Sequence, residues 1–197
     1  MDQNLQALLL FTISVAFTPG PNNLMITASG ANFGFWRSLP HMMGVTMGFP
    51  IMLIAMAVGL LQLFETWPAL HVILRYAGAI YMIYLAYRIA TATSIGKATS
   101  AGSPLSFLEA VLFQWINPKA VINVLSILTL FTTTNGNFVK EVTYLALVTL
   151  FVTLASISTW CIFGISIGHL LKTPRTLRAF NLGMAIALIA SLILIFR

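Results

Sequence analysis

Charged residues and cysteines are both scarce in this sequence. Asp, Glu, Lys and Arg together make up 7% of its 197 residues, whereas a typical soluble protein has roughly 25%. The single cysteine, Cys161, excludes an internal disulfide, a Cys-x-x-Cys redox pair and a cysteine-based metal cluster. Neither a phosphate-binding G-x-x-x-x-G-K-S/T loop nor an H-E-x-x-H zinc motif occurs. We therefore expect no enzymatic activity, no catalytic site, no metal site and no cofactor.

The three histidines add no support for a metal site. His41, His71 and His169 are far apart in the sequence, and each lies near the end of a predicted helix. Histidine is the side chain that titrates near neutral pH, but at a helix end it is most often exposed or caps the helix. We interpret all three in this way.

Apolar residues dominate the sequence. Hydrophobic side chains make up 59% of it, and the mean hydropathy is +0.95. A transmembrane helix needs about 20 mainly apolar residues, and six windows meet or approach that length: 5–30, 40–64, 68–90, 105–131, 142–168 and 178–196. The pattern predicts an all-α integral membrane protein with six transmembrane helices. We expect a single transmembrane domain over 1–197, with the first helix retained rather than cleaved as a signal peptide.

A polar segment divides these windows into two groups of three. Residues 93–104 are rich in small and polar side chains, which is typical of a linker or hinge. The sequence therefore predicts a first three-helix repeat at 1–92 and a second at 105–197. Because each repeat holds an odd number of helices, the second crosses the bilayer in the opposite direction, and the repeats are inverted.

The net charge of +6 comes from basic residues scattered among short loops. No basic and aromatic platform accompanies them, so we expect no nucleic-acid partner. An excess of Lys and Arg marks the cytoplasmic loops of membrane proteins. Loops 1–2, 3–4 and 5–6 carry six such residues and the other side carries three, so both termini are predicted outside. The six are Arg37, Arg88, Lys97, Lys172, Arg175 and Arg178, and the three are Arg75, Lys140 and Arg197.

Proline and glycine interrupt the first apolar window. The interruption reads Thr18-Pro19-Gly20-Pro21-Asn22-Asn23, and its prolines resist ordinary helix. Such a break exposes carbonyls before it and amides after it. Amides at a half-helix N-terminus suit a carboxylate, while the carbonyls suit an ammonium group or a cation. The break therefore predicts a site for a zwitterion; the alternative is a kink that only shapes packing.

A second interruption lies at the matching place in the other half. It reads Gln114-Trp115-Ile116-Asn117-Pro118-Lys119, and Lys119 is the lysine deepest in an apolar span. A central lysine costs about 2.5–3.5 kcal/mol on insertion scales, so it should face a cavity or a partner. No Asp or Glu lies at that depth, so we expect Lys119 to meet polar atoms, backbone carbonyls or an anionic substrate. The alternative is snorkelling to the membrane surface.

Paired breaks in two repeats are typical of secondary transporters, whose substrates bind between discontinuous helices. We therefore predict a transporter with a substrate-binding site at both breaks. The predicted site residues are Pro19, Gly20, Pro21, Asn22, Asn23, Gln114, Asn117, Pro118 and Lys119. The glycine pairs Gly44-x-x-x-Gly48 and Gly164-x-x-x-Gly168 are interpreted as sites of close helix packing.

Three stretches resemble the LysE/RhtB family of amino-acid exporters over nearly the whole chain. They are the two breaks and the segment Gly78-Ala79-Ile80-Tyr81-x-x-Tyr84-Leu85-Ala86-Tyr87-Arg88. The segment and the Asn22-Asn23 pair are most similar to the cysteine and O-acetylserine exporter branch. After Lys119 the sequence departs from the aromatic-rich stretch of other members, which leaves the substrate range open.

The resemblance implies a bacterial inner-membrane secondary exporter of amino acids or their derivatives, powered by the proton gradient. Its partners would be the amino-acid substrate, protons and the lipid bilayer. A passive channel, or an exporter of another small zwitterionic or ionic solute, is the alternative. The sequence leaves open whether the chains associate into homo-oligomers.

Overall fold

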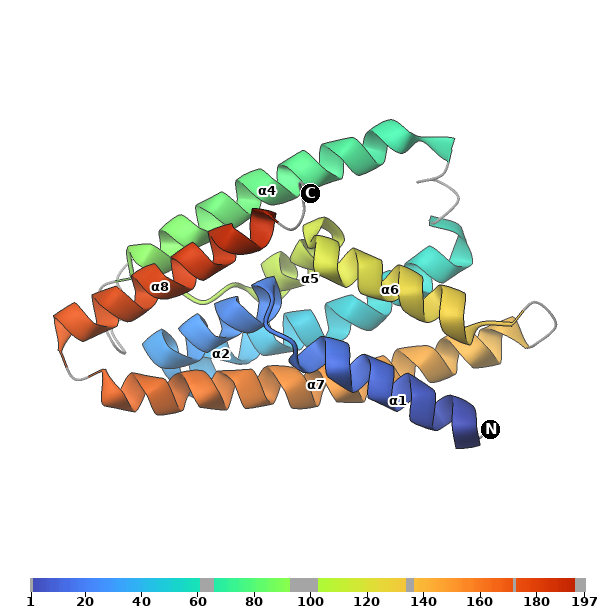
Figure 1. Cartoon of the computed structure of the whole chain (residues 1–197), viewed down its shortest axis with the longest axis horizontal. Coiled ribbons are helices and arrows are strands. Elements are labelled where there is room, and N and C mark those ends of the chain that lie inside the picture. Colours follow the sequence, from blue (N-terminus) through green and yellow to red (C-terminus); the bar gives the residue numbers. More distant parts are fainter. Residues whose placement is uncertain (1, 61–65, 93–102, 134–136, 172, 194–197) are drawn as a thin grey trace.

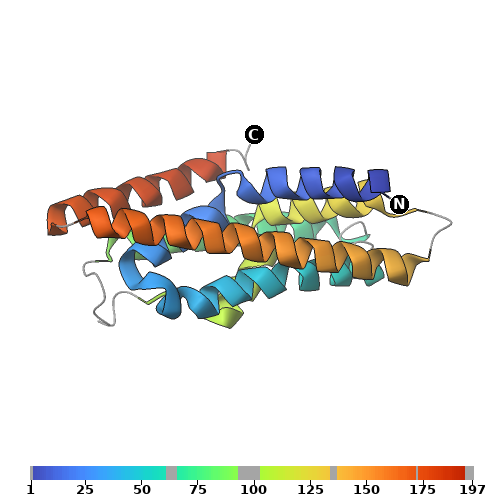
Figure 2. The ribbon, with the colours of Figure 1, turned by 90° about the horizontal axis from the view of Figure 1, so that it is seen from below.

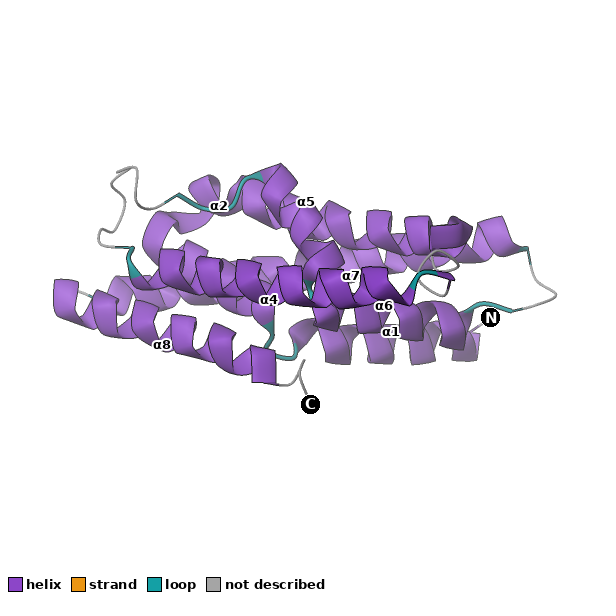
Figure 3. Ribbon diagram, turned by 90° about the horizontal axis from the view of Figure 1, so that it is seen from above, coloured by secondary structure: helices purple, strands orange, loops and turns teal. Residues whose placement is uncertain are grey.

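The computed structural model describes residues 2–60, 66–92, 103–133, 137–171 and 173–193 (Figure 1). These residues form helices joined by short loops and include no strand (Figure 3). The all-α prediction is therefore confirmed. In chain order the elements are α1 (Asp2–Phe17), α2 (Pro21–Ala55), the π-helical turn η1 (Met56–Leu60), α4 (Pro68–Ala90), α5 (Phe107–Ile116), α6 (Pro118–Phe131), α7 (Phe138–Leu170) and α8 (Pro174–Ile193).

Several helices have the length and composition of membrane spans. Four apolar stretches are long enough to cross a bilayer, at Pro21–Gly59, Val72–Ala90, Phe138–Leu170 and Pro174–Leu192. The pair α5 and α6, bent by 69°, counts as a fifth if it is one span. Large apolar side chains such as Ile80, Phe151 and Ile186 are exposed, as expected of surfaces that face lipid. The predicted division into six spans is not established by these lengths and stays a prediction.

The helix α2 reverses direction at Gly34. This glycine has φ +76°, a backbone conformation that side chains with a Cβ rarely adopt. The hydroxyls of Ser29 and Ser38, nine residues apart, lie 2.7 Å from each other. In a straight helix nine residues span about 13.5 Å, so α2 consists of two segments, 21–33 and 35–55, that fold back on each other (Figure 2).

The long helix α7 packs closely against segment 21–33. A Cβ added at Gly164 would meet the backbone carbonyl of Thr27, and one at Gly168 would lie 2.8 Å from the carbonyl oxygen of Ala31. On the opposing surface, a Cβ at Gly30 would meet the carbonyl of Cys161. The interpretation of the glycine pair in α7 as a packing site is confirmed.

The pair in segment 35–55 has the same role against α5. A Cβ added at Gly44 would meet Phe107 and Ala110, and one at Gly48 would lie 2.9 Å from the Cα of Val111. This close approach fixes α5 relative to α2, and α5 ends at the second break. Both packing contacts therefore place the breaks described next.

Most of the predicted helix boundaries lie close to the observed ones. The window 68–90 coincides with α4, and the window 142–168 lies inside α7. The last helix begins at Pro174, earlier than the predicted 178. The predicted repeat boundary falls in the linker 93–104, of which residues 93–102 lie outside the described residues.

Candidate functional site

The first break separates α1 from segment 21–33. Gly20 is extended, with φ −172° and ψ 178°, and Pro21 occupies the first turn of the next helix. A proline costs nothing in hydrogen bonding there, because the N–H it lacks would have no intrahelical partner. The buried side chain of Asn23 donates to the carbonyls of Ala16 (2.8 Å) and Thr18 (2.9 Å). Asn23 thereby satisfies carbonyls that the end of α1 leaves without helical partners.

The second break separates α5 from α6 at Asn117. Its backbone is extended, with φ −85° and ψ 105°, and Pro118 follows at the start of α6. The side-chain oxygen of Asn117 accepts the backbone N–H of Lys119 at 3.2 Å and so caps α6. A proline in the first turn therefore begins a half-helix at each break, and among the described residues a side-chain cap accompanies it only at the second.

The two breaks lie against each other although they are far apart in the sequence. The Nζ of Lys119 donates to the carbonyl of Thr18 at 2.6 Å, across 101 residues. The amides of Asn22 and Gln114 exchange two hydrogen bonds, of 2.8 and 3.3 Å. A Cβ on Gly20 would lie 2.7 Å from the Cδ of Lys119, so glycine leaves room for the lysine side chain. The expectation that Lys119 meets backbone carbonyls is confirmed.

A cavity of about 60 Å³, counted as space open to the centres of water-sized molecules, lies at this junction. Five of the predicted site residues line it, namely Gly20, Asn22, Asn23, Asn117 and Lys119. The other four do not line it. The breaks are shaped by Pro19, Pro21 and Pro118. Gln114 is hydrogen-bonded to the side chain of Asn22.

Several polar residues of the cavity escaped the sequence prediction. Thr12, Asn123, Thr153 and Ser156 line it together with apolar side chains. A signal existed for Asn123, because it follows Lys119 by four residues and so lies on the same face of α6. Ser156 is buried, and its hydroxyl donates to the carbonyl of Ala16 at 2.8 Å. Its role could not be read from the sequence, because several other Ser and Thr residues surround it on α7.

The junction combines positive and negative partial charges at short range. Segment 21–33 and α6 both begin here, and helix N-termini carry a partial positive charge. The ammonium of Lys119 adds a full charge, and its partner Thr18 is a neutral carbonyl. Arg88 and Glu109 form an ion pair, and no carboxylate within the described residues pairs with Lys119. The cavity therefore has an unneutralised cation beside exposed carbonyls.

Broken apolar helices around a polar cavity define a multi-pass helical membrane protein. The sequence model described as "LysE type translocator" matches residues 13–196. The chain belongs to this family, which confirms the resemblance stated from its motifs.

Three relatives share one description. Proteins called "Cysteine/O-acetylserine efflux protein" from Escherichia coli (strain K12) and Shigella flexneri serotype 5b (strain 8401) are 33% identical over 118 residues. A protein of the same name from Escherichia coli O1:K1 / APEC is 32% identical over 118 residues. The match covers 60% of this chain and 60% of each relative. No solved structure matches the chain.

Proposed function

We propose that this protein is a secondary exporter of neutral amino acids or their derivatives, cysteine and O-acetylserine among them, in the bacterial inner membrane. The observation that carries the proposal is the junction of the two breaks, where Lys119 reaches the carbonyl of Thr18 beside a polar cavity. The LysE type translocator match and the names of the relatives favour amino-acid efflux.

A zwitterion can use both kinds of partner at the junction. Its carboxylate would replace the Thr18 carbonyl as the partner of Lys119, since a charged acceptor forms the stronger hydrogen bond with an ammonium. Its own ammonium would then bind carbonyls at the end of α1. The reciprocal pair of Asn22 and Gln114 would hold the two half-helices in register while the solute is bound.

The six-span, two-repeat arrangement is part of this proposal. We group α1 with 21–33 as one broken span, 35–60 as the second and α4 as the third, all within the repeat 1–92. The repeat 105–197 then supplies α5 with α6 as the matching broken span, followed by α7 and α8. Opposite motions of the two repeats would expose the cavity to each side of the membrane in turn.

Proton coupling is the driving force that we propose. Among the described residues that line the cavity, none is Asp or Glu. These residues therefore offer no carboxylate that could carry the proton. Lys119, the ionisable groups of the solute, or water would have to carry the proton. A passive channel is the competing function, and it would give flux without coupling.

Efflux from right-side-out vesicles tests the proposal. Vesicles that contain the protein and labelled O-acetylserine should release the solute saturably, and an imposed proton gradient should accelerate release. Vesicles without the protein serve as the control. Saturable release that ignores the gradient would refute proton coupling, while unsaturable release would favour the channel.

The charge of the loops gives the proposed orientation. With six basic residues on one side and three on the other, both termini should lie in the periplasm and Lys97 in the cytoplasm. A periplasm-specific reporter such as alkaline phosphatase, fused after Arg197, should be active, and a cytoplasm-specific reporter there should be inactive. Activity of the cytoplasmic reporter alone would show that the number of spans or the orientation is wrong.

A further inference from the structure

A second cavity, mainly apolar with a few polar side chains, lies between segments 21–33 and 35–55, α4 and residues 103–105, which precede α5. Its free space is about 50 Å³, counted for the centres of water-sized molecules. Segment 21–33 borders both cavities, with Asn22 at the first and Asn32 at the second. Ten residues of helix separate these asparagines, which corresponds to about 15 Å. Among the described residues, none lines both cavities. The second cavity is therefore separate from the first, although both border segment 21–33.

His41 borders this second cavity, and its ring nitrogens are buried and, among the described residues, unsatisfied. The side chain is 1% exposed, which corrects the expectation of an exposed or capping histidine. Within the described part of the chain, neither of its ring nitrogens has a hydrogen-bond partner. A neutral imidazole offers one donor and one acceptor, and leaving both unpaired in a buried place is costly. An occupant of the cavity that accepts and donates hydrogen bonds would remove that cost.

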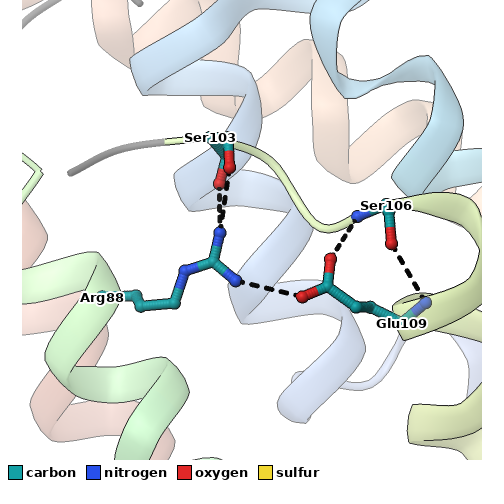
Figure 4. Close-up of polar contacts among 4 residues, drawn as sticks. All are labelled: Arg88, Ser103, Ser106 and Glu109. Atoms are coloured by element: carbon teal, nitrogen blue, oxygen red, sulfur yellow. Dashed lines mark hydrogen bonds and ion pairs between the residues drawn. The ribbon is translucent and has the colours of Figure 1, made fainter. Parts of the chain in front are cut away.

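Arg88 lines the same cavity, and its guanidinium faces Ser103 and Glu109 (Figure 4). Its Nη2 donates to the backbone carbonyl and hydroxyl of Ser103, at 2.8 and 3.1 Å. Its Nη1 approaches the Oε1 of Glu109 at 3.4 Å, and both side chains are partly exposed. The other oxygen of Glu109 accepts the N–H of Ser106 at 2.7 Å in the cap of α5.

The contact between Arg88 and Glu109 is therefore one that a free carboxylate can displace. It is long for a charged hydrogen bond, which normally measures about 2.7–2.9 Å, and it lies where solvent screens it. Glu109 would keep its bonds within the cap of α5 after losing Arg88. A guanidinium can also hold an incoming carboxylate through two parallel hydrogen bonds.

The lining residue Asn32 is held in place by a buried amide, that of Asn181, which does not itself line the cavity. Asn32 and Asn181 exchange hydrogen bonds of 2.7 and 3.0 Å, and Asn181 also donates to the carbonyl of Ala92 at 3.0 Å. Because these bonds engage the amides with each other, the groups left for an occupant are Arg88 and His41. Apolar side chains, including Met25 and Leu85, complete the wall and suit a short side chain.

We propose that this second cavity is another binding station for the exported solute, and that it holds the carboxylate between Arg88 and His41. The inference rests on the proposed export function and adds a second solute-binding site along the export route. A small amino acid fits the station because it supplies a carboxylate for Arg88 and a donor and acceptor for His41. The arrangement resembles that of the first cavity, where a reciprocal amide pair also stands beside one cationic side chain.

Equilibrium binding of labelled O-acetylserine to the full chain in lipid nanodiscs tests the station. We expect two molecules per wild-type chain at saturation. His41→Leu should weaken one of the two sites at least tenfold, because a carboxylate loses a hydrogen bond and faces an apolar group. His41→Asn should restore part of the affinity, since its amide keeps a donor and an acceptor.

Thr46→Val is the matched control for His41→Leu. Thr46 lies on the same segment 35–55, is also buried with an unpartnered polar atom, and lines neither cavity. Both variants replace an unsatisfied polar group by an apolar one, so the melting temperature should be unchanged or higher in each. Only His41→Leu should lose affinity.

The outcomes separate this inference from the proposed function. One molecule per wild-type chain, lost in Lys119→Met and unaffected by His41→Leu, would overturn the second station and leave only water there. No binding of either labelled O-acetylserine or labelled cysteine to the wild-type chain would overturn the proposed function together with the second station.

Discussion

Replacement of Lys119 by methionine should weaken solute binding at the first cavity about ten- to more than a hundredfold. The ammonium donates across the breaks to the Thr18 carbonyl, so it is placed to bind a carboxylate that enters there. A hydrogen bond to a charged group contributes about 1.5–3 kcal/mol, which gives the stated change in affinity. The half-saturation concentration for efflux of labelled cysteine or O-acetylserine from vesicles measures the effect.

Insertion should not confound this result. Methionine is similar in length, and it removes the cost of about 2.5–3.5 kcal/mol that a central lysine carries on insertion scales. Lys119→Arg keeps the charge but replaces a compact ammonium by a planar fork, so partial activity is expected. Lys140→Met is the control for loss of charge, because Lys140 is exposed in the first turn of α7, away from the cavity. All variants are compared at equal amounts per vesicle.

An unchanged half-saturation concentration and rate in Lys119→Met would contradict this role. Lys119 would then only hold the end of α1 through Thr18. The carboxylate would have to be bound by the amides at the starts of segment 21–33 and α6 alone.

The two breaks could be predicted because their causes are local. Prolines and an extended glycine stop a helix through their own geometry, and the structure places the non-helical residues within the predicted stretches, at 18–20 and at Asn117. The side-chain pairs that join the breaks could not be predicted from the local sequence. Asn22 and Gln114 are 92 residues apart, and their pairing depends on how α5 packs against α2.

The second cavity shows where an apolar sequence gives little information. A helix that is apolar all round has no periodicity to separate its lipid-facing side from its protein-facing side. His41 was therefore assigned to a helix end, although segment 35–55 begins directly after Gly34 and carries His41 into the interior. The predicted windows 5–30 and 40–64 left a loop at 31–39, and the reversal at Gly34 lies within it.

The contact between α2 and α7 helps to position Asn23, which lines the first cavity. Thr27 lies against Gly164, and its hydroxyl donates to the carbonyl of Asn23, the residue that satisfies the carbonyls of the first break. Four residues before Gly164 in α7, the carbonyl of Trp160 accepts a longer hydrogen bond of 3.3 Å from the same hydroxyl. A change in the spacing of these helices should therefore disturb both stability and the site.

Substitution of Gly164 by leucine should destabilise the protein strongly, whereas the same change at Gly183 should not. At Gly164 even the Cβ would meet the Thr27 backbone, which cannot move aside as a flexible side chain can. Overpacking typically costs about 1–3 kcal/mol and occasionally more, and a backbone obstacle places this variant at or above the upper end. Gly183 lies on the exposed face of α8 with no atom within 4 Å of an added Cβ. Leucine there should be neutral or favourable, because glycine costs about 1 kcal/mol in a helix interior.

Thermal unfolding in matched nanodiscs should show a lower midpoint for Gly164→Leu and no loss for Gly183→Leu. Equal midpoints would contradict the close contact of α2 with α7, and with it the support that this contact gives to Asn23.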